Sequence, residues 1–217
     1  MSSVLRESLV AGVQALGLEL SGEQIDRLLE FMALLQKWNK VYNLTAVRDP
    51  QEMLTHHLLD SLAAVAPLQR HVVAASPSLP VRLLDVGSGG GLPGVVFAIC
   101  CPQVEVHCVD TVAKKAAFIQ QAAATLRLPN LHGIHARVEN LKETFDVVSC
   151  RAFASLADFT TWSRQSLGPQ AVWLAMKGKH PQDELAALGS DVQVFHVEPL
   201  VVPGLEAERC IIWMRPA

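Results

Sequence analysis

The sequence lacks a Cys-x-x-Cys pair, and its five cysteines are odd in number. These two facts exclude the usual patterns of a disulfide framework and of a zinc knuckle. The first twenty residues contain no basic region followed by a continuous apolar segment, and no stretch of about 18 uninterrupted apolar residues occurs. We therefore expect no signal peptide and no membrane span, and a reducing, cytoplasmic location is the simplest interpretation.

An excess of positive charge is also absent. Lys and Arg number 18 against 21 Asp and Glu, which gives a formal net charge of −3. This balance excludes a protein that is basic overall, but net charge does not report a local basic patch. Lys37, Lys40 and Arg48 flank the segment "VYNLTAV" and are candidates for such a patch, although charged residues at solvated helix ends explain them equally well.

Two regimes of hydrophobic periodicity divide the 217 residues. Residues 1–70 predict helices, with a capping-box pattern at Ser21 and a second start signal at Asp49-Pro50 that opens a helix to about Val65. We expect residues 1–70 to form a helical subdomain and residues 71–217 a second domain, with residues 70–80 as the linker. In the second domain, strand patterns occur at residues 81–86, 104–109, 131–135, 145–150, 171–176, 192–197 and 209–214.

Helical patterns separate most of these strands, at residues 92–101, 113–126, 154–167 and 181–188. Strand–helix alternation predicts an α/β fold, in which a parallel sheet has helices on both faces. The last two strands are joined by the turn-rich segment "EPLVVPGLEAE", which shows no clear helix. We therefore expect a seven-stranded, mostly parallel sheet whose last strand is antiparallel.

A glycine-rich loop comes after the first predicted strand in "LLDVGSGGGLPGVVFAI". No Gly-Lys-Ser/Thr occurs after it, which excludes a Walker A loop, but Gly89, Gly91 and Gly94 fit the G-x-G-x-x-G pattern of dinucleotide-binding proteins. A second register, Asp85-x-Gly87-x-Gly89-x-Gly91, resembles the first motif of class I S-adenosylmethionine-dependent methyltransferases. Asp85 favours the second register, because a carboxylate repels a pyrophosphate and attracts the ammonium of S-adenosylmethionine.

Two further acidic residues are candidates for contacts with a nucleoside. Asp110 comes directly after the second predicted strand and 19 positions after Gly91, where a carboxylate accepts hydrogen bonds from ribose hydroxyls. This residue suits NAD and S-adenosylmethionine alike. Glu139, in "HARVENL" after the third strand, is placed to reach an adenine amine while the Val138 backbone meets the ring. A glutamate that merely begins a helix explains Glu139 equally well.

The residues after the fourth predicted strand narrow the choice of methyl acceptor. The sequence "DVVSCRAFASL" contains no Asn/Asp-Pro-Pro-aromatic motif, which is typical of enzymes that methylate exocyclic amines. Cys150 suggests the covalent mechanism of pyrimidine-C5 methyltransferases, in which a thiolate attacks the base. In those enzymes the cysteine comes after a proline, whereas here Ser149 precedes it. A ring nitrogen such as guanine N7 carries a free lone pair and needs positioning rather than a base.

Six motifs occur in order along the chain: "VYNLTAVRDP", "HHLLDSL", "LLDVGSGGGLPG", "RVEN", "SCRAFASL" and "AMKG". Together they resemble the RsmG (GidB) family of bacterial 16S rRNA guanine-N7 methyltransferases. The resemblance implies a Rossmann-like class I methyltransferase domain with an N-terminal helical extension, and S-adenosyl-L-methionine as cofactor. It implies cofactor contacts by Gly87, Gly89, Leu92, Asp110, Val138 and Glu139, a catalytic Arg151 where cofactor and target base meet, and an RNA-contacting Lys177.

The resemblance also implies the partner, which is 16S rRNA. The negative net charge predicts weak binding to naked RNA, so we expect the substrate to be the small ribosomal subunit or an assembly intermediate. A monomer is favoured. His56 and Asp60 are spaced to share a metal, but no third ligand is evident and we expect no metal site. A nicotinamide-dependent oxidoreductase and a noncatalytic binder of nucleosides or ribosomes remain alternatives.

Overall fold

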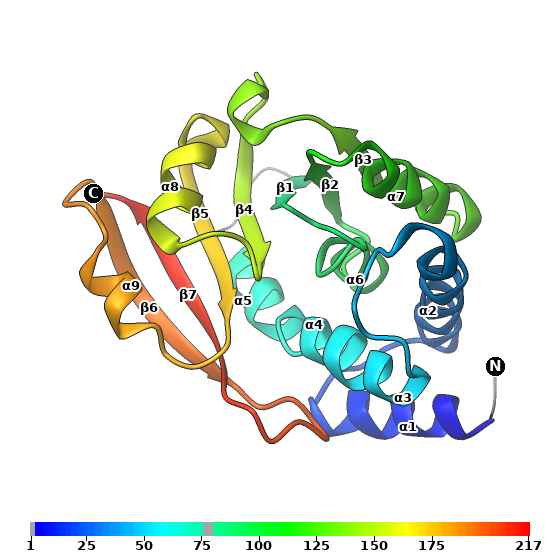
Figure 1. Cartoon of the computed structure of the whole chain (residues 1–217). Coiled ribbons are helices and arrows are strands. Elements are labelled where there is room, and N and C mark those ends of the chain that lie inside the picture. Colours follow the sequence, from blue (N-terminus) through cyan, green and yellow to red (C-terminus); the bar gives the residue numbers. More distant parts are fainter. Residues whose placement is uncertain (1–2, 76–79) are drawn as a thin grey trace.

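A computed structural model describes residues 3–75 and 80–217 of the chain. In these residues seven strands form one sheet in the order β3-β2-β1-β4-β5-β7-β6 (Figure 1). Strands β1 to β6 run in the same direction, and β7 is antiparallel to both of its neighbours, as predicted. The strands are β1 (Val81–Val86), β2 (Val104–Asp110), β3 (Leu131–His135), β4 (Phe145–Arg151), β5 (Leu167–Lys177), β6 (Val192–Leu200) and β7 (Arg209–Pro216).

Alternating side chains of the central strands form two apolar clusters, one on each face of the sheet. Leu83 of β1 faces α6 (Gly94–Cys100) and α7 (Ala113–Thr125), whereas Leu84 faces α8 (Leu156–Ser163). Three short elements complete this half of the chain: η2 (Val138–Asn140), η3 (Arg164–Ser166) and α9 (Gln182–Ala186). The predicted helix at 154–167 therefore ends early, because η3 turns the chain into β5 four residues before the expected strand.

The N-terminal helices begin where the capping signals predict. The Ser21 hydroxyl accepts from the Gln24 N–H and the Gln24 side chain accepts from the Ser21 N–H, which starts α2 (Gly22–Tyr42). Asp49 caps α3 (Pro50–Met53), with Pro50 in the first helical position. α1 (Ser3–Ala15) precedes both of these helices.

The helix predicted to run from Asp49 to about Val65 has a more complex course. After α3 the chain enters a π-helical segment, η1 (Leu54–Leu59), and then α4 (Asp60–Leu62). α5 (Val65–Ala75) contains Pro67 in its first turn, where the missing N–H costs nothing, so the proline does not end the helix as expected. The predicted linker therefore starts inside α5, and its residues 76–79 lie outside the described residues.

The helices before β1 pack on the α6 and α7 face of the sheet. Leu28 and Leu35 of α2 share one buried apolar cluster with Phe118 of α7 and Phe97 of α6. The Gln24 side chain also donates to the Ile99 carbonyl at 2.9 Å. The helical segment thus closes one face of the sheet, while the division of the chain at residues 70 and 71 stays a prediction. Among the described residues, no helix is both long enough and apolar enough to cross a membrane.

Candidate functional site

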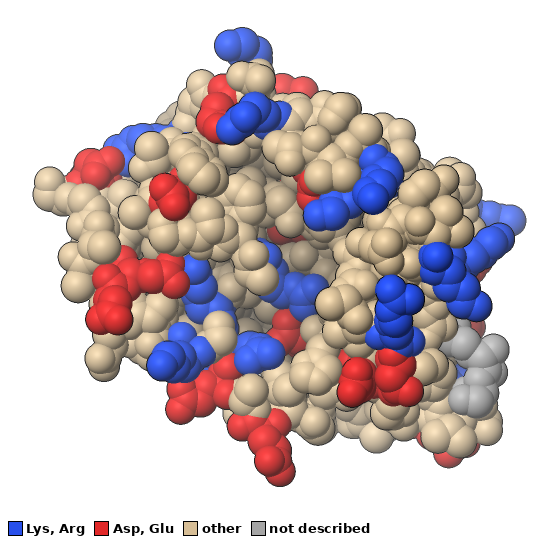
Figure 2. Space-filling model, viewed as in Figure 1, with Lys and Arg blue, Asp and Glu red and all other residues tan. Residues whose placement is uncertain are grey.

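Two clefts open where β1, β2, β4 and β5 end at their carboxyl edge. The large cleft, of about 640 Å³, lies between this edge and the N-terminal helices, and the small cleft, of about 390 Å³, lies over the ends of β1 and β2. Gly87 and Ala152 line both clefts, so the two spaces meet at the glycine-rich loop. On the face drawn in Figure 2, Lys and Arg side chains lie in and beside a depression near the middle of the molecule, with Asp and Glu side chains among them.

The glycine-rich loop is anchored from below by Asp85. Its carboxylate is fully buried and accepts from the Gly94 N–H at 3.0 Å and from the Ser149 hydroxyl at 3.1 Å. Burial raises the pKa of Asp85 to about 6, although these hydrogen bonds oppose the shift. A side chain added at Gly94 would lie 2.3 Å from the Cys108 sulfur. The Asp85 carboxylate therefore shapes the loop from below and lines neither cleft. The prediction that it attracts a cofactor ammonium is wrong.

Gly87 requires glycine for two reasons. Its φ is +67°, and a Cβ there would lie 2.3 Å from the Phe153 ring. Phe153 lines the small cleft and packs edge-on against Trp162, with ring centroids 5.9 Å apart. The backbone at Gly87 is therefore exposed to close approach from both clefts and is covered on one side by an aromatic ring.

Asp110 ends β2 in the small cleft and is 6% exposed. One carboxylate oxygen accepts from the Gly89 N–H at 3.0 Å and the other from the Val112 N–H at 2.8 Å, and the Lys115 ammonium lies 3.7 Å away. A carboxylate offers about four lone-pair positions, so two remain for a ligand. Asp110 thus holds the loop and still presents acceptors to the cleft.

Val138 and Glu139 lie on η2 and line the small cleft together with Asp110. Val138 is buried, whereas Glu139 is part-exposed and its carboxylate lies 3.6 Å from the Arg137 guanidinium. The structure therefore brings together the three residues predicted for the nucleoside end. Gly89 and Leu92 line the large cleft instead, and Gly89 is linked to the small cleft through its bond to Asp110.

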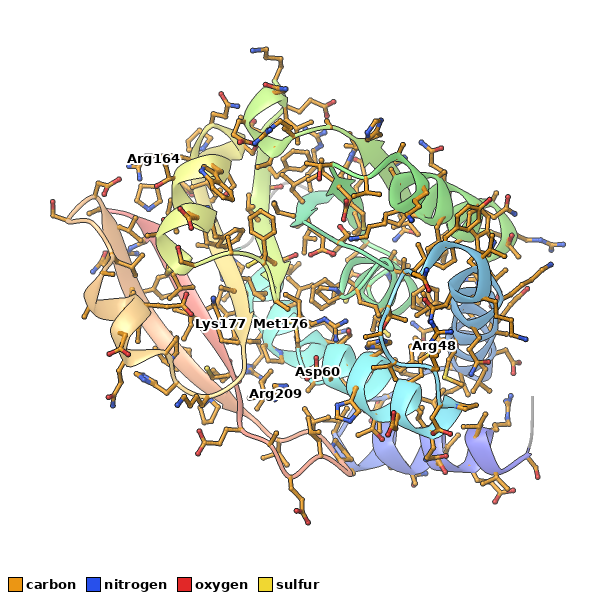
Figure 3. The ribbon with its side chains drawn as sticks, viewed as in Figure 1. Arg48, Asp60, Arg164, Met176, Lys177 and Arg209 are labelled. Carbon is orange, nitrogen blue, oxygen red and sulfur yellow. The ribbon has the colours of Figure 1, made fainter. Side chains whose placement is uncertain are left out.

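Arg151 ends β4 in the large cleft, and its guanidinium is held by the N-terminal helices. It donates to the Asp60 carboxylate at 2.8 Å and to the His56 carbonyl at 3.0 Å. Arg209, at the start of β7, donates to the other Asp60 oxygen at 2.7 Å, and Figure 3 shows Asp60 and Arg209 lying close together. Asp60 is buried, so one carboxylate joins two cations from distant parts of the chain. We call Asp60, Arg151 and Arg209 the Asp60 bridge.

Sequence reasoning missed Asp60 and Arg209 as site residues. In the structure, Asp60 of the "HHLLDSL" motif ties its helix to β4 and β7 through hydrogen bonds from Arg151 and Arg209. No signal in the sequence connects Arg209 with Asp60, since 149 positions separate them. A π-helical segment lies just before Asp60. Such segments are frequent at functional sites, but no pattern in the sequence predicts this one.

His57 lies beside the Asp60 bridge and is buried. Its Nε2 lies 2.7 Å from the Thr45 hydroxyl, which comes from the "VYNLTAV" segment. Burial, followed by the positive charge of Arg151, lowers the pKa of His57 to about 4. The imidazole is therefore neutral at pH 7 and is a weak proton acceptor.

Lys177 ends β5 and lines the large cleft, but its ammonium has protein partners. It donates to the Glu184 carboxylate at 2.8 Å and to the Ala154 carbonyl at 3.1 Å. Glu184 also accepts from the Leu156 N–H at 2.7 Å, so the pair fixes the start of α8. Cys150, on the neighbouring strand, is buried, and burial raises its thiol pKa, which argues against a nucleophilic thiolate.

The residues of the predicted basic patch lie on α2 and in the loop after it, and they are not among the residues that line the large cleft. Lys37 and Lys40 are exposed on α2, and Arg48 is exposed in the loop after that helix, where it donates to the Asn43 side chain at 3.2 Å. Figure 3 places Arg48 beside α2, across the cleft from Lys177. Arg48 and Lys177 therefore lie on opposite sides of the opening.

The sequence of this chain is similar to those of known rRNA methyltransferases. A family model described as rRNA small subunit methyltransferase G (GidB) matches residues 24–212. The ribosomal RNA small subunit methyltransferase G of Acidovorax sp. (strain JS42) is 77% identical over 211 residues, which span 94% of this chain and 92% of that protein. The protein of the same name from Acidovorax ebreus (strain TPSY) is 75% identical over 216 residues, covering 98% and 96%.

Among solved structures, the fold is similar to that of coclaurine N-methyltransferase bound to N-methylheliamine and SAH. The TM-score is 0.54 at 14% sequence identity, over 91% of this chain and 73% of that one. At this identity the likeness concerns the fold alone. It agrees with the class I methyltransferase sheet expected from the sequence.

Proposed function

The chain belongs to the rRNA small subunit methyltransferase G (GidB) family, and from this we propose that it transfers a methyl group from S-adenosyl-L-methionine to N7 of a guanine in 16S rRNA. The observation that carries the proposal is the meeting of the two clefts at Gly87. One cleft gathers the residues predicted for a nucleoside, and the other is open to a large, anionic partner.

The small cleft fits the nucleoside end of this cofactor. Asp110 retains acceptors for the ribose hydroxyls, while Val138 and Glu139 line the same space and would hold the adenine. Gly87, Gly89 and Leu92 would lie along the methionine part, where the glycine backbone allows close approach. When bound, the cofactor supplies an electrophilic methyl group. A nicotinamide cofactor finds no support in the family match.

The large cleft fits an acceptor that loses no proton. Both oxygens of Asp60 are bonded to arginines, and His57 has a pKa of about 4, so neither group is a good base at pH 7. Guanine N7 attacks through its own lone pair and needs only alignment with the methyl group. Arg151, held by Asp60, would contact the base where the two clefts meet.

The surface beside the large cleft suits the phosphates of a folded RNA. Lys37, Lys40 and Arg48 are exposed on α2 and in the loop after it, close in sequence to Leu35, Leu44 and Val47, which line the cleft, and Lys177 lines it as well. Phosphate contacts position such a partner, while the cleft selects the base. We propose that the protein acts as a monomer in the cytoplasm. Because its net charge is −3, we propose the small subunit or an assembly intermediate as its substrate rather than naked RNA.

The test uses small ribosomal subunits from a strain that lacks this gene. Purified protein is incubated with them and with cofactor that carries a labelled methyl group, and the product is mapped by N7-specific strand cleavage. We expect one methylated guanine in 16S rRNA and little transfer to naked rRNA. Label at an exocyclic amine or a ribose oxygen would overturn the N7 assignment, and binding of NADH without binding of S-adenosylhomocysteine would overturn the activity.

A further inference from the structure

A second cluster of ligating side chains lies at the other end of the sheet, far from both clefts. Glu105 and His107 are two residues apart on β2, so they share one face of the strand. His132 on β3 is the register partner of His107 and faces the same side. Asp110 is five positions after Glu105 on β2, which corresponds to about 16 Å along the strand.

The three ligand atoms converge on one point. The Glu105 Oε1 lies 2.8 Å from the His107 Nε2 and 3.6 Å from the His132 Nε2, and all three ligand atoms lie within 4.8 Å of one another. The two imidazole rings are 4.7 Å apart between centroids. The His107 side chain is 10% exposed, Glu105 33% and His132 45%, so the cluster is anchored on one side and open to water on the other.

We propose that Glu105, His107 and His132 bind a divalent transition-metal ion of the zinc class. Two imidazole nitrogens and one carboxylate oxygen form a ligand set that zinc accepts, with a fourth position left for water. Magnesium and calcium prefer sets made of oxygen alone and are not expected here. This site serves no step of the methyl transfer and is independent of the proposed function.

The contact between His107 and Glu105 would be replaced by the ion. The His107 Nε2 atom lies 2.8 Å from the Glu105 carboxylate, so the ion takes the place of this hydrogen bond and the His107 proton resides on Nδ1.

One positive group faces the cluster from the neighbouring strand. Arg82 on β1 is the register partner of Glu105. Its guanidinium pairs with the Glu143 carboxylate, donates to the Thr144 carbonyl at 2.9 Å and lies 4.7 Å above the Phe145 ring. Arg82 is therefore directed toward the β4 end and is largely neutralised by Glu143, which reduces its repulsion of a bound cation.

Packing holds the His107 side chain in place. The ion would also link two neighbouring strands, which gives it a stabilising role. The His107 ring packs edge-on against Phe145, with centroids 5.1 Å apart, which limits its rotation. β3 is an edge strand of the described sheet, in which it pairs with β2 alone. An ion held by both strands would tie this edge to the sheet, so we expect it to stabilise the folded state.

The test titrates the full-length, metal-free protein with ZnCl₂ in competition with a chromophoric chelator, and with CoCl₂ while visible absorption is recorded. The thiols are kept reduced, and all five are buried and absent from the cluster. We expect one equivalent to bind, a rise in the melting temperature with zinc, and no rise with MgCl₂. His132→Ala should weaken zinc binding at least about tenfold, and Glu105→Gln should act in the same direction.

The matched control is His135→Ala, which removes an exposed histidine from the same strand but not from the cluster. This variant should bind zinc as the wild type does. Unchanged affinity in His132→Ala and Glu105→Gln, or no binding to the wild type, would overturn the proposal. Methyl transfer by His132→Ala should equal that of the wild type, so failure of the metal site and failure of the proposed function are separable.

Discussion

The two clefts hold their acidic residues in opposite ways. In the small cleft, Asp110 is bonded to backbone N–H groups of the loop next to it. In the large cleft, Asp60 is bonded to Arg151 and Arg209, two side chains from other parts of the sheet. The first arrangement is local to adjacent strand ends. The second arrangement exists only when the N-terminal helices and the last strand are both in place.

This difference predicts unequal costs when either acid is removed. Loss of Asp110 leaves backbone donors that water at the cleft can reach. Loss of Asp60 leaves two arginines without their shared anion. Water reaches them poorly, because the Arg151 side chain is only 18% exposed and the Arg209 side chain only 24%. An unpaired, largely buried charge is expensive, so the large cleft should depend more on its acid for folding than the small cleft does.

Asp60→Ala is expected to have the largest effect. It should lower the free energy of unfolding by about 3–5 kcal/mol, because two partly buried cations lose their partner. Urea denaturation measures the loss, and Glu52→Gln, at an exposed acid that lines the same cleft, is the control. A loss below about 1 kcal/mol would mean that water solvates both arginines and that the Asp60 bridge does not hold the helices to the sheet.

Two buried titratable groups, Asp85 and His57, should make opposite contributions to the pH dependence of the free energy of unfolding. The pKa of Asp85 is raised to about 6, so the stability it contributes is present below about pH 4 and is lost as pH rises through 6. The pKa of His57 is lowered to about 4, so its contribution is present above about pH 6.5 and is lost as pH falls through 4. In the wild type these two slopes largely cancel.

Single variants should separate the two slopes. Relative to the wild type, Asp85→Asn should gain about 3 kcal/mol of unfolding free energy between pH 4 and pH 7, and His57→Gln should lose about as much over the same range. Chemical denaturation at four pH values measures both differences. Parallel curves for a variant and the wild type would show that its residue does not titrate with the shifted pKa.

Asp110→Ala should weaken binding of S-adenosylhomocysteine about 10- to 100-fold, because charge-assisted hydrogen bonds to the ribose are lost. The domain should remain folded, since β2 keeps its pairing with β1 and β3. Calorimetric titration measures the affinity, and thermal melting checks the fold. Asp183→Asn, at an exposed acid on α9, controls for the change in net charge. Unchanged affinity would remove Asp110 from the cofactor site.

Replacement of Lys37, Lys40 and Arg48 together by Gln should have the smallest effect. Methylation of small subunits should fall a few-fold and become less sensitive to salt, because up to about three phosphate contacts are lost. Binding of S-adenosylhomocysteine should not change, since none of these residues lines the small cleft. Equal salt dependence in the variant and the wild type would show that these three side chains do not contact RNA.

The residues of the small cleft were predictable, because they stand at the ends of strands whose patterns are clear in the sequence. Asp110 ends β2 and Val138 comes after β3, and parallel strands bring their carboxyl ends to one edge. Asp85 also stands out in the sequence, but its orientation was not predictable. Whether a carboxylate at a strand end faces a cleft or the underside of a loop depends on packing around Gly94 and Ser149.

The sequence by itself determined the strand–helix alternation, the antiparallel last strand, the glycine-rich loop and the helix starts at Ser21 and Asp49, because each depends on periodicity or on neighbouring residues. Tertiary structure alone decided which charges meet. The Asp60 bridge joins residues 60, 151 and 209, and the metal cluster joins positions 105, 107 and 132. Their physical cause is strand register and helix docking over long separations, which bring side chains together without leaving a local signal in the chain.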